Sequence, residues 1–307
     1  MKSLKEYASL VEERLPRLVP EGQGSVPASG GMPALQAESM RYSLLAGGKR
    51  LRPSLLLAAV DMLGGDLEEA MVPACALEMI HTYSLIHDDL PGMDNDTLRR
   101  GRPTNHVVFG EGQAILAGDG LLNLAYELML QNAMAYPEHA ARHIQAMNGI
   151  AACVGSRGMV AGQCLDLMWE QRKGVPGADP QRLLYYIQEN KTARLLIAPL
   201  CAAAALTGHA PEDAVTAALT GYGLHFGLLF QAVDDLLDVV GDAQALGKST
   251  GKDAEEGKLT CVTLWGIDKT RQWAQRQTEQ AIECLAPLGE KADFFRALVR
   301  EMTHRVR

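Results

Sequence analysis

The sequence predicts an all-helical protein with a single large domain over residues 1–307. Aromatic residues make up only 5% of the chain, and long stretches rich in Ala, Leu and Met are separated by Gly and Pro. Strand-like alternating segments with hairpin turns are not evident, which favours helices over the α/β classes. Hydrophobic residues make up 47% of the chain and charged residues 21%, enough for one large core.

The helices are expected between segments of turn-forming residues. A short N-terminal helix is expected before the Gly- and Pro-rich segment 22–33, which leads into the main body. Long helical stretches are expected within 114–134, 140–168 and 181–206, where small apolar residues indicate central, buried helices. Pro199 is expected to kink or interrupt the last of these. Other predicted breaks are residues 64–65, 91–92, 101–103, 173–180, 208–211 and 241–257.

Charge and cysteine content exclude several classes of protein. The net charge of −8 disfavours a nucleic-acid partner, which needs a basic face. The longest apolar run, 195–206, is shorter than the roughly 20 residues that span a bilayer. Charged residues within 1–15 do not resemble a secretory signal. The six cysteines form no C-x-x-C pair, so we expect reduced thiols and a cytoplasmic location without stable membrane insertion.

The most informative segment is 77–102, where an apolar helix leads directly into four aspartates and then three arginines. His81, Ser84 and Asp88 are spaced i, i+3 and i+7, so they form one polar stripe on the helix. The Pro91-Gly92 pair should break the helix and allow Asp94 to return towards Asp88. Both carboxylates can then share one cation.

A second acidic cluster, Asp234-Asp235-x-x-Asp238, also emerges from apolar sequence. Asp234 and Asp238 are at i, i+4 on one helix face, where unpaired like charges repel and a bound cation removes the penalty. Carboxylates without nearby cysteine ligands suit a hard ion such as Mg²⁺, which also binds water and phosphate oxygens. One such cluster is weak support for a metal site, but two on apolar helices favour it.

Basic residues interleave with both clusters, as a diphosphate ligand would require. The glycine-bearing segment 241–258 lacks the spacing and final Lys-Ser/Thr of a nucleotide P-loop, which argues against ATP binding. The basic groups are Lys49, Arg50 and Arg52 beside a glycine pair, Arg99 and Arg100 after the first cluster, and Lys248, Lys252 and Lys258 after the second.

Together these motifs resemble the short-chain trans-prenyl diphosphate synthases, most closely the bacterial type of farnesyl diphosphate synthase. The resemblance covers nearly the whole chain and implies the isoprenoid synthase fold: one all-helical domain around a deep central cavity, normally paired as a homodimer. It implies head-to-tail condensation of an allylic diphosphate with isopentenyl diphosphate. The matching segments are GGKRLRP at 47–53, DDLPGMD at 88–94, LRRGRPTNH at 98–106, GQCLD at 162–166, KT at 191–192, FQAVDDLLD at 230–238 and GKSTGKD at 247–253.

The resemblance also assigns roles to individual residues. It implies Mg²⁺, three ions per active site with substrate bound, held directly by Asp88, Asp94 and Asp234. Asp89, Asp235, Asp238 and Asp253 are expected to act through water or through contacts behind the metals. Arg99 and Lys191 are expected to hold the allylic diphosphate, with Lys248 and Lys258 closing over it. Thr192 and Gln231 are expected to line the path of the carbocation.

Isopentenyl diphosphate binds cations rather than metal in this family, and the matching residues here are Gly48, Lys49, Arg52, His81 and Arg100. His81 could alternatively be a core histidine, and the pair Gln163 and Asp166, which matches a motif beside the metals, could be a polar pair within the core. Thr97 departs from relatives that continue the acidic run. The basic end, residues 303–307, could approach the isopentenyl site or be solvated.

Product length is expected to depend on Tyr83, with Ser84 beside it. Tyr83 precedes Asp88 by five residues, so its backbone lies roughly 7.5 Å below the first carboxylate on a helix. In the family an aromatic residue here accompanies the fifteen-carbon product, so we predict farnesyl diphosphate from dimethylallyl and geranyl diphosphates. Tyr83 could alternatively be only a core residue.

Other functions remain open at this level. A geranylgeranyl or geranyl diphosphate synthase of the same family would share these motifs. A terpene cyclase usually has an Asn/Ser/Glu-type second metal site instead of a second aspartate-rich one. A non-catalytic subunit of a heteromeric synthase would be expected to have lost one aspartate cluster, and both are intact here.

Overall fold

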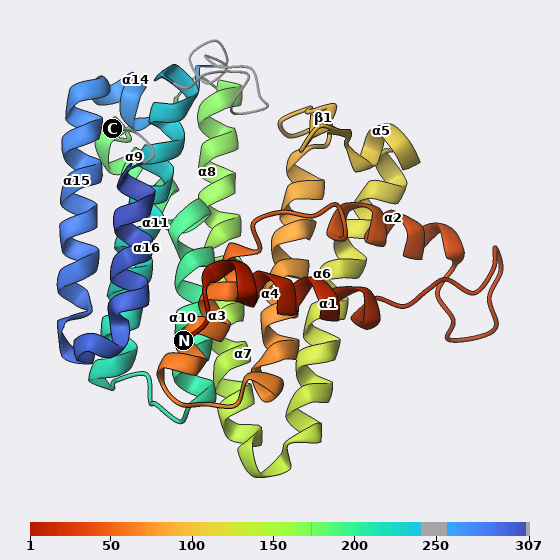
Figure 1. Ribbon diagram of the computed structural model, residues 1–307. Helices are drawn as coiled ribbons and strands as arrows, with labels where there is room; N and C mark the ends of the chain where they lie inside the picture. Colours follow the sequence, from red (N-terminus) through yellow and green to blue (C-terminus); the bar gives the residue numbers. More distant parts are fainter. Residues whose placement is uncertain (173, 241–256, 305–307) are drawn as a thin grey trace. The chain divides into compact units, whose positions relative to one another are not determined.

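The computed structural model describes residues 1–172, 174–240 and 257–304. They belong to two compact units, unit 1 (Met1–Met147) and unit 2 (Asn148–Arg307). Apart from one two-stranded hairpin, the regular elements of the described residues are helices, which confirms the all-helical prediction (Figure 1). None of the described helices combines the length and apolar character needed to cross a membrane.

Unit 1 is built around helix α4 (Leu67–Asp88), which packs against four other helices of the unit. Asp66 caps its N-terminus by accepting a hydrogen bond from the Glu68 N–H (2.8 Å). The neighbours of α4 are α1 (Leu4–Leu18), α2 (Ala34–Leu44), α3 (Leu51–Met62) and α6 (Glu111–Ala135).

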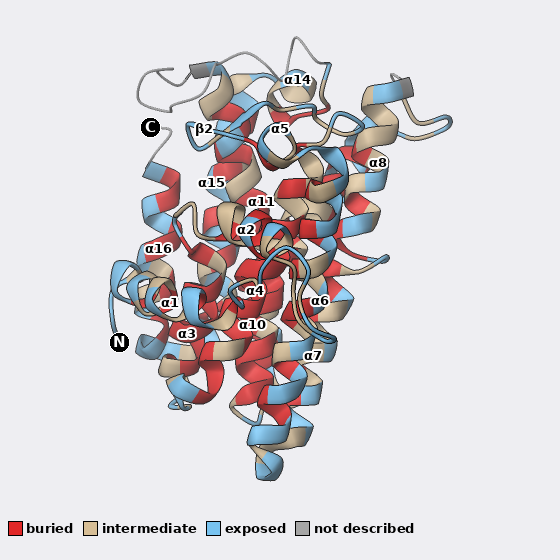
Figure 2. Ribbon diagram, turned by 90° about the vertical axis from the view of Figure 1, so that its right-hand side faces the viewer, coloured by how far each residue is buried: buried red, intermediate tan, exposed pale blue. Residues whose placement is uncertain are grey.

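The burial pattern explains why α4 is central. Most of its residues are buried (Figure 2), and a helix that is apolar on most sides is stable only when other helices cover it. Polar residues gather instead at its C-terminal end, where Asp88 is the last helical residue. The sequence prediction of an apolar helix leading into the aspartates is therefore confirmed.

The rest of unit 1 comprises a hairpin, two short helices and part of a longer helix. The hairpin strands β1 (Leu98–Arg99) and β2 (Arg102–Pro103) are antiparallel, with Leu98 opposite Pro103 and Arg99 opposite Arg102. Helix α5 (Asn105–Phe109) and the 3₁₀ helix η1 (Pro137–His139) flank α6, and α7 (Ala140–Val154) contains the boundary with unit 2.

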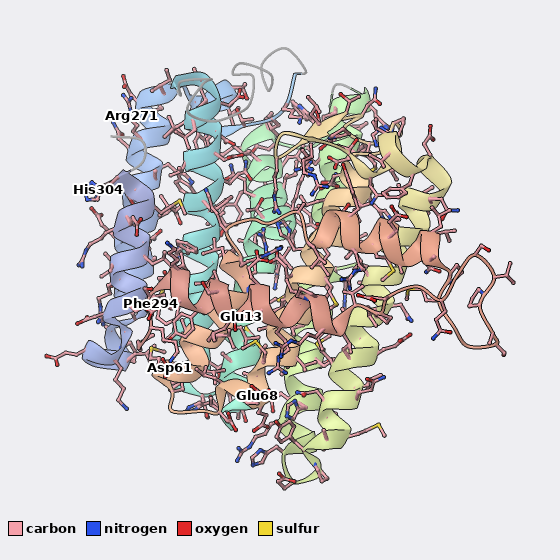
Figure 3. All side chains as sticks on the ribbon, turned by 45° about the vertical axis from the view of Figure 1, so that its right-hand side comes forward. Glu13, Asp61, Glu68, Arg271, Phe294 and His304 are labelled. Carbon is pink, nitrogen blue, oxygen red and sulfur yellow. The ribbon has the colours of Figure 1, made fainter. Side chains whose placement is uncertain are left out.

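Unit 2 is built around α11 (Ala214–Val240), which packs against α10 (Arg194–Leu206) and α15 (Ile267–Cys284). Exposed polar side chains such as Arg271 on α15 and His304 on α16 lie on the outer faces of their helices (Figure 3). The other elements are α8 (Met159–Arg172), α9 (Pro180–Ile187), the π-helix η2 (Gln188–Ala193), α14 (Cys261–Trp265), the 3₁₀ helix η3 (Ala286–Ala292) and α16 (Asp293–His304).

Helix α10 continues through Pro199, so the interruption predicted as one alternative at this residue is wrong, while the kink predicted as the other stays a prediction. Proline removes one backbone donor, a loss of about 3 kcal/mol in an isolated helix interior. Nearly every residue of α10 is buried, so side-chain packing offsets that loss. The π-helix η2, which separates α9 from α10, lies in a segment where the sequence predicted one long helical stretch.

Candidate active site

The first aspartate cluster follows the end of α4 in a tight turn. The Asp94 N–H donates to the Asp88 carbonyl oxygen (2.8 Å), and the Asn95 N–H donates to the Leu90 carbonyl oxygen (3.1 Å). Asn95 has a φ of 53°, a left-handed conformation that asparagine tolerates. The backbone of Asp94 therefore returns to Asp88, as the Pro91-Gly92 pair predicts.

The two adjacent aspartates at the end of α4 differ in their surroundings. Asp88 is half-buried, whereas Asp89 is 3% exposed. The Arg99 Nε donates to both Asp89 oxygens (2.7 and 2.9 Å), and Arg99 Nη2 lies 2.6 Å from Oδ1. Burial raises the pKa of Asp89 above its ordinary value, and the bond to Arg99 offsets part of this effect. Asp89 thus anchors Arg99.

The consecutive residues Arg99 and Arg100 lie in different elements, Arg99 in β1 and Arg100 in the β1–β2 turn. Arg100 and Gly101 both have positive φ (52° and 73°), as a two-residue hairpin turn requires. Arg100 donates to the Gly47 carbonyl oxygen and lies over Gly48. A Cβ at Gly48 would come within 2.6 Å of Arg100 Nη1, and Gly48 has a φ of 147°. Glycine is therefore required where the two segments meet.

Arg52 and Arg100 give this part of unit 1 positive charge, and His81 lies close to both. Arg52 Nε and His81 Nδ1 are buried and have no hydrogen-bond partner among the described residues. Burial lowers the pKa of Arg52 to about 10, and burial followed by the nearby arginines lowers the pKa of His81 well below its ordinary value. Buried groups without a partner beside two arginines suit an anionic ligand. Lys49 is exposed in the segment before α3.

Arg50 is a structural residue that the sequence analysis grouped with the other cations. Its side chain is fully buried. Arg50 Nε donates to Glu12 (2.7 Å), Nη1 to Glu78 (2.7 Å) and Nη2 to the Leu44 carbonyl oxygen (2.8 Å). It therefore joins α1, α4 and the end of α2 just before α3 begins.

In unit 2 the adjacent aspartates of the second cluster also differ in exposure. Asp234 is exposed and Asp238 half-buried on α11, whereas Asp235 is 2% exposed. The Asp235 Oδ1 accepts from Gln231 Nε2 (2.8 Å), and its Oδ2 accepts from the Cys261 N–H (2.7 Å). Asp235 therefore bonds to groups of the protein, while Asp234 is accessible.

Lys191 and Thr192 lie in the π-helix η2. Lys191 Nζ donates to the buried Asp166 of α8 (2.5 Å), and Thr192 Oγ1 donates to Gln231 Oε1 (2.9 Å). Asp166 therefore pairs with a predicted substrate-binding lysine, and Gln163 lies one turn before it on α8. π-helical turns are rare and frequent at functional sites, and the apolar pattern of the sequence gave no sign of this one.

Two glycines allow close packing around η2. A Cβ at Gly162 of α8 would lie 2.2 Å from the Lys191 backbone nitrogen, and a Cβ at Gly227 of α11 would lie 2.4 Å from the Ala193 Cα. Any larger residue would push the backbone of η2 away from these helices. The glycine of the GQCLD segment thus positions Lys191, a role that sequence reasoning missed.

The remaining predicted residues are partly described. Lys258 is half-buried in the segment before α14, and its carbonyl oxygen accepts from Thr263 Oγ1 (3.2 Å). Trp169 of α8 donates to the neighbouring Gly257 carbonyl oxygen (3.1 Å). Lys248, Lys252 and Asp253, as well as residues 305–307 of the basic end, lie outside the described residues.

Tyr83 and Ser84 lie on α4 one turn before Asp88. Tyr83 is 8% exposed, and its ring meets the His87 ring edge-on with centroids 5.7 Å apart. Burial, followed by the nearby Tyr126 and Asp88, raises the pKa of the Tyr83 phenol to about 12. Ser84 Oγ donates to the His81 carbonyl oxygen (2.9 Å), so its hydroxyl bonds back to its own helix.

The donor sets fit Mg²⁺. Asp88 with Asp94 in unit 1, and Asp234 with Asp238 in unit 2, are carboxylate pairs of the kind that hard cations prefer. Among the described residues, no group of three or more His, Cys, Asp or Glu side chains is arranged to hold a metal. Mg²⁺ commonly takes only one or two carboxylates and completes its shell with water and substrate phosphates.

Comparison with known proteins identifies the family. The protein-family model described as "Polyprenyl synthetase" matches residues 33–302. The chain belongs to the polyprenyl synthetase family. It is 42% identical to "Dimethylallyltranstransferase" of Fischerella ambigua (strain UTEX 1903) over 298 residues, which cover 95% of this chain and 84% of that protein. It is 46% identical to "Geranylgeranyl pyrophosphate synthase, chloroplastic" of Catharanthus roseus over 269 residues, 87% of this chain and 73% of that protein.

A solved structure gives the same family and fold. An apo crystal structure of an "FPP/GFPP synthase" from Zymomonas mobilis aligns with a TM-score of 0.82 and 32% identity, covering 98% of this chain and 97% of that one. The polyprenyl synthetase therefore has the isoprenoid synthase fold, and it is a prenyltransferase that elongates prenyl diphosphates.

Proposed function

We propose that this polyprenyl synthetase condenses isopentenyl diphosphate with dimethylallyl and then geranyl diphosphate, and that elongation ends at farnesyl diphosphate. The observation that carries the condensation chemistry is the presence of two kinds of diphosphate-binding group, one basic and one acidic. In unit 1, Arg52 Nε and His81 Nδ1 are buried without a hydrogen-bond partner among the described residues, while both acidic clusters carry partly or fully accessible carboxylates for a metal-bound diphosphate.

The first step in this proposal is ionisation of the allylic substrate. The C1–O bond breaks, its electron pair goes to the diphosphate, and an allylic cation remains. Arg99, held by Asp89, and Lys191, held by Asp166, stabilise the charge that develops on the leaving diphosphate. Asp88, Asp94 and Asp234 would hold Mg²⁺, which when bound supplies further positive charge to that leaving group.

The second step forms the new bond. Lys49, Arg52 and Arg100 bind the isopentenyl diphosphate, with Gly48 leaving room for Arg100. The π electrons of the isopentenyl double bond attack C1, which forms a carbon–carbon bond and a tertiary cation. Loss of a proton from C2 of the former isopentenyl unit to the released diphosphate restores a double bond. Thr192 and Gln231 present oxygen atoms to the cations, which stabilises them.

Product length follows from the ring of Tyr83 in this proposal. Its place five residues before Asp88 and its burial beside His87 make it a barrier below the first carboxylate. The relative from Catharanthus roseus is named as a geranylgeranyl pyrophosphate synthase, so a twenty-carbon product is the second candidate.

The test uses the purified full chain with radiolabelled isopentenyl diphosphate, each allylic starter and Mg²⁺, followed by chromatography of the dephosphorylated products. We expect incorporation that stops in excess chelator and a fifteen-carbon product. A twenty-carbon product would support the second candidate. No incorporation with any starter would favour a non-catalytic subunit, and turnover in excess chelator would refute the metal-dependent mechanism.

We also propose that two copies of the chain associate through the outer face of α6. Family resemblance implies a homodimer, and α6 exposes Ile115, Leu116, Leu130 and Met134, with exposed fractions between 43% and 79%. Light scattering should give twice the 33.2 kDa chain mass. Leu116→Lys should yield monomers. Leu35→Lys should not, because Leu35 is similarly exposed (48%) but lies on α2. A concentration-independent monomer mass for the wild type would refute the proposal.

A further inference from the structure

A chain of hydrogen bonds in unit 2 links two proposed cation-stabilising residues to a buried carboxylate. Thr192 Oγ1 donates to Gln231 Oε1 (2.9 Å), and Gln231 Nε2 donates to Asp235 Oδ1 (2.8 Å). The other oxygen of Asp235 accepts from the Cys261 N–H (2.7 Å). These hydrogen bonds thus link η2, α11 and the first residue of α14.

The Asp235 carboxylate fixes the direction of these hydrogen bonds. An ionised carboxylate only accepts hydrogen bonds, so the Gln231 amide must turn its NH₂ group towards Asp235. Its oxygen must then face the other way, where it accepts the only proton of the Thr192 hydroxyl. A reversed amide would place oxygen against oxygen at Asp235, inside a region where Asp235 is 2% exposed.

The direction matters for the proposed chemistry. With the Thr192 proton engaged, the half-buried Thr192 and Gln231 offer lone pairs of oxygen rather than N–H groups. Oxygen lone pairs stabilise a cation, whereas an amide NH₂ in the same place would repel it. Orienting dipoles before the reaction avoids reorganisation when charge develops.

We propose that Asp235 is a positioning residue that orients the Gln231 amide for carbocation stabilisation, and that it is not a ligand of the metal. This inference rests on the proposed roles of Thr192 and Gln231. It separates the two adjacent aspartates of α11 by function: the exposed Asp234 binds metal, and the buried Asp235 sets the polarity of Gln231.

The decisive variant is Asp235→Asn. Its carboxamide oxygen must accept from the fixed Cys261 N–H, so its NH₂ group faces Gln231 and forces that amide to reverse. Single-turnover condensation of geranyl and isopentenyl diphosphates should slow by about tenfold or more. The Mg²⁺ concentration for half-maximal rate should stay within about twofold of the wild-type value. Asp234→Asn is the matched control, and its half-maximal Mg²⁺ concentration should rise.

A double-mutant cycle tests the coupling. In a Gln231→Met background, where no amide remains to be oriented, Asp235→Asn should change the rate by no more than about twofold. Circular dichroism checks folding. If Asp235→Asn does not fold, Asp235→Glu replaces it, because it keeps two acceptor oxygens but displaces them, and its loss of rate should likewise require Gln231.

Three results would overturn the inference. The first is a full rate loss by Asp235→Asn in the Gln231→Met background. The second is recovery of the Asp235→Asn rate at high Mg²⁺, which would make Asp235 a metal ligand. The third is a wild-type single-turnover rate for Gln231→Met. Each leaves the condensation activity of the wild type standing, whereas a wild type without condensation activity refutes the proposed function itself.

Discussion

Arg50→Met should destabilise the protein strongly, because Arg50 neutralises a buried carboxylate. The Arg50 side chain is 0% exposed, and that of its partner Glu78 is 3% exposed. Removing one partner of a buried ion pair leaves the other charge uncompensated, which costs roughly 3–5 kcal/mol. The other carboxylate, Glu12, is 40% exposed, so water can replace Arg50 there and the loss adds little.

Urea denaturation of the purified variants measures this cost. Arg14→Met is the matched control: it removes an ion pair with Glu68, whose side chains are 29% and 62% exposed, and it should cost about 0–1 kcal/mol. The double variant Arg50→Met/Glu78→Met should recover most of the lost free energy of unfolding, because no buried charge remains. A loss below about 1 kcal/mol for Arg50→Met, or a double variant no more stable than the single one, would show that the buried pair does not stabilise unit 1.

Two further predictions concern the charged groups of the site. Asp88→Ala and Asp234→Ala should each lower the single-turnover rate by orders of magnitude with an intact helical circular dichroism spectrum, because each removes a carboxylate proposed to hold Mg²⁺; near-normal rates would refute that assignment. His81 should make stability depend on pH: its folded pKa lies well below the ordinary value, so the unfolded state binds its proton first as the pH falls below about 6.5. The free energy of unfolding should therefore decrease below that pH by up to about 1.4 kcal/mol per unit, and less steeply in His81→Gln; parallel pH profiles would contradict this.

Features set by local sequence were predictable. The apolar α4 ends at Asp88 because apolar residues give way to charged ones there, and the Pro91-Gly92 pair produces the turn that brings Asp94 back. The family could be predicted because its short motifs can be read directly from the sequence. The product length was left open, because synthases of the family that make products of different length share these motifs.

Features set by distant contacts were not predictable. Arg50 stands between basic residues that were predicted to bind a diphosphate, yet its partners Glu12 and Glu78 are 38 and 28 positions away. The π-helix η2 depends on Gly162 and Gly227, which lie on other helices and let their backbones approach. The division of each Asp-Asp pair into a buried and a more accessible carboxylate likewise follows from tertiary packing.

The central claim, elongation to farnesyl diphosphate with Tyr83 as the barrier, is tested most directly by comparing the products of the wild type and Tyr83→Ala. Both enzymes receive geranyl diphosphate and excess isopentenyl diphosphate with Mg²⁺, and the dephosphorylated products are separated by chain length. We predict a fifteen-carbon product from the wild type and a shift to the twenty-carbon product from Tyr83→Ala, because removing the ring opens space for another five-carbon unit. An unchanged fifteen-carbon product from a folded, active Tyr83→Ala would contradict the account.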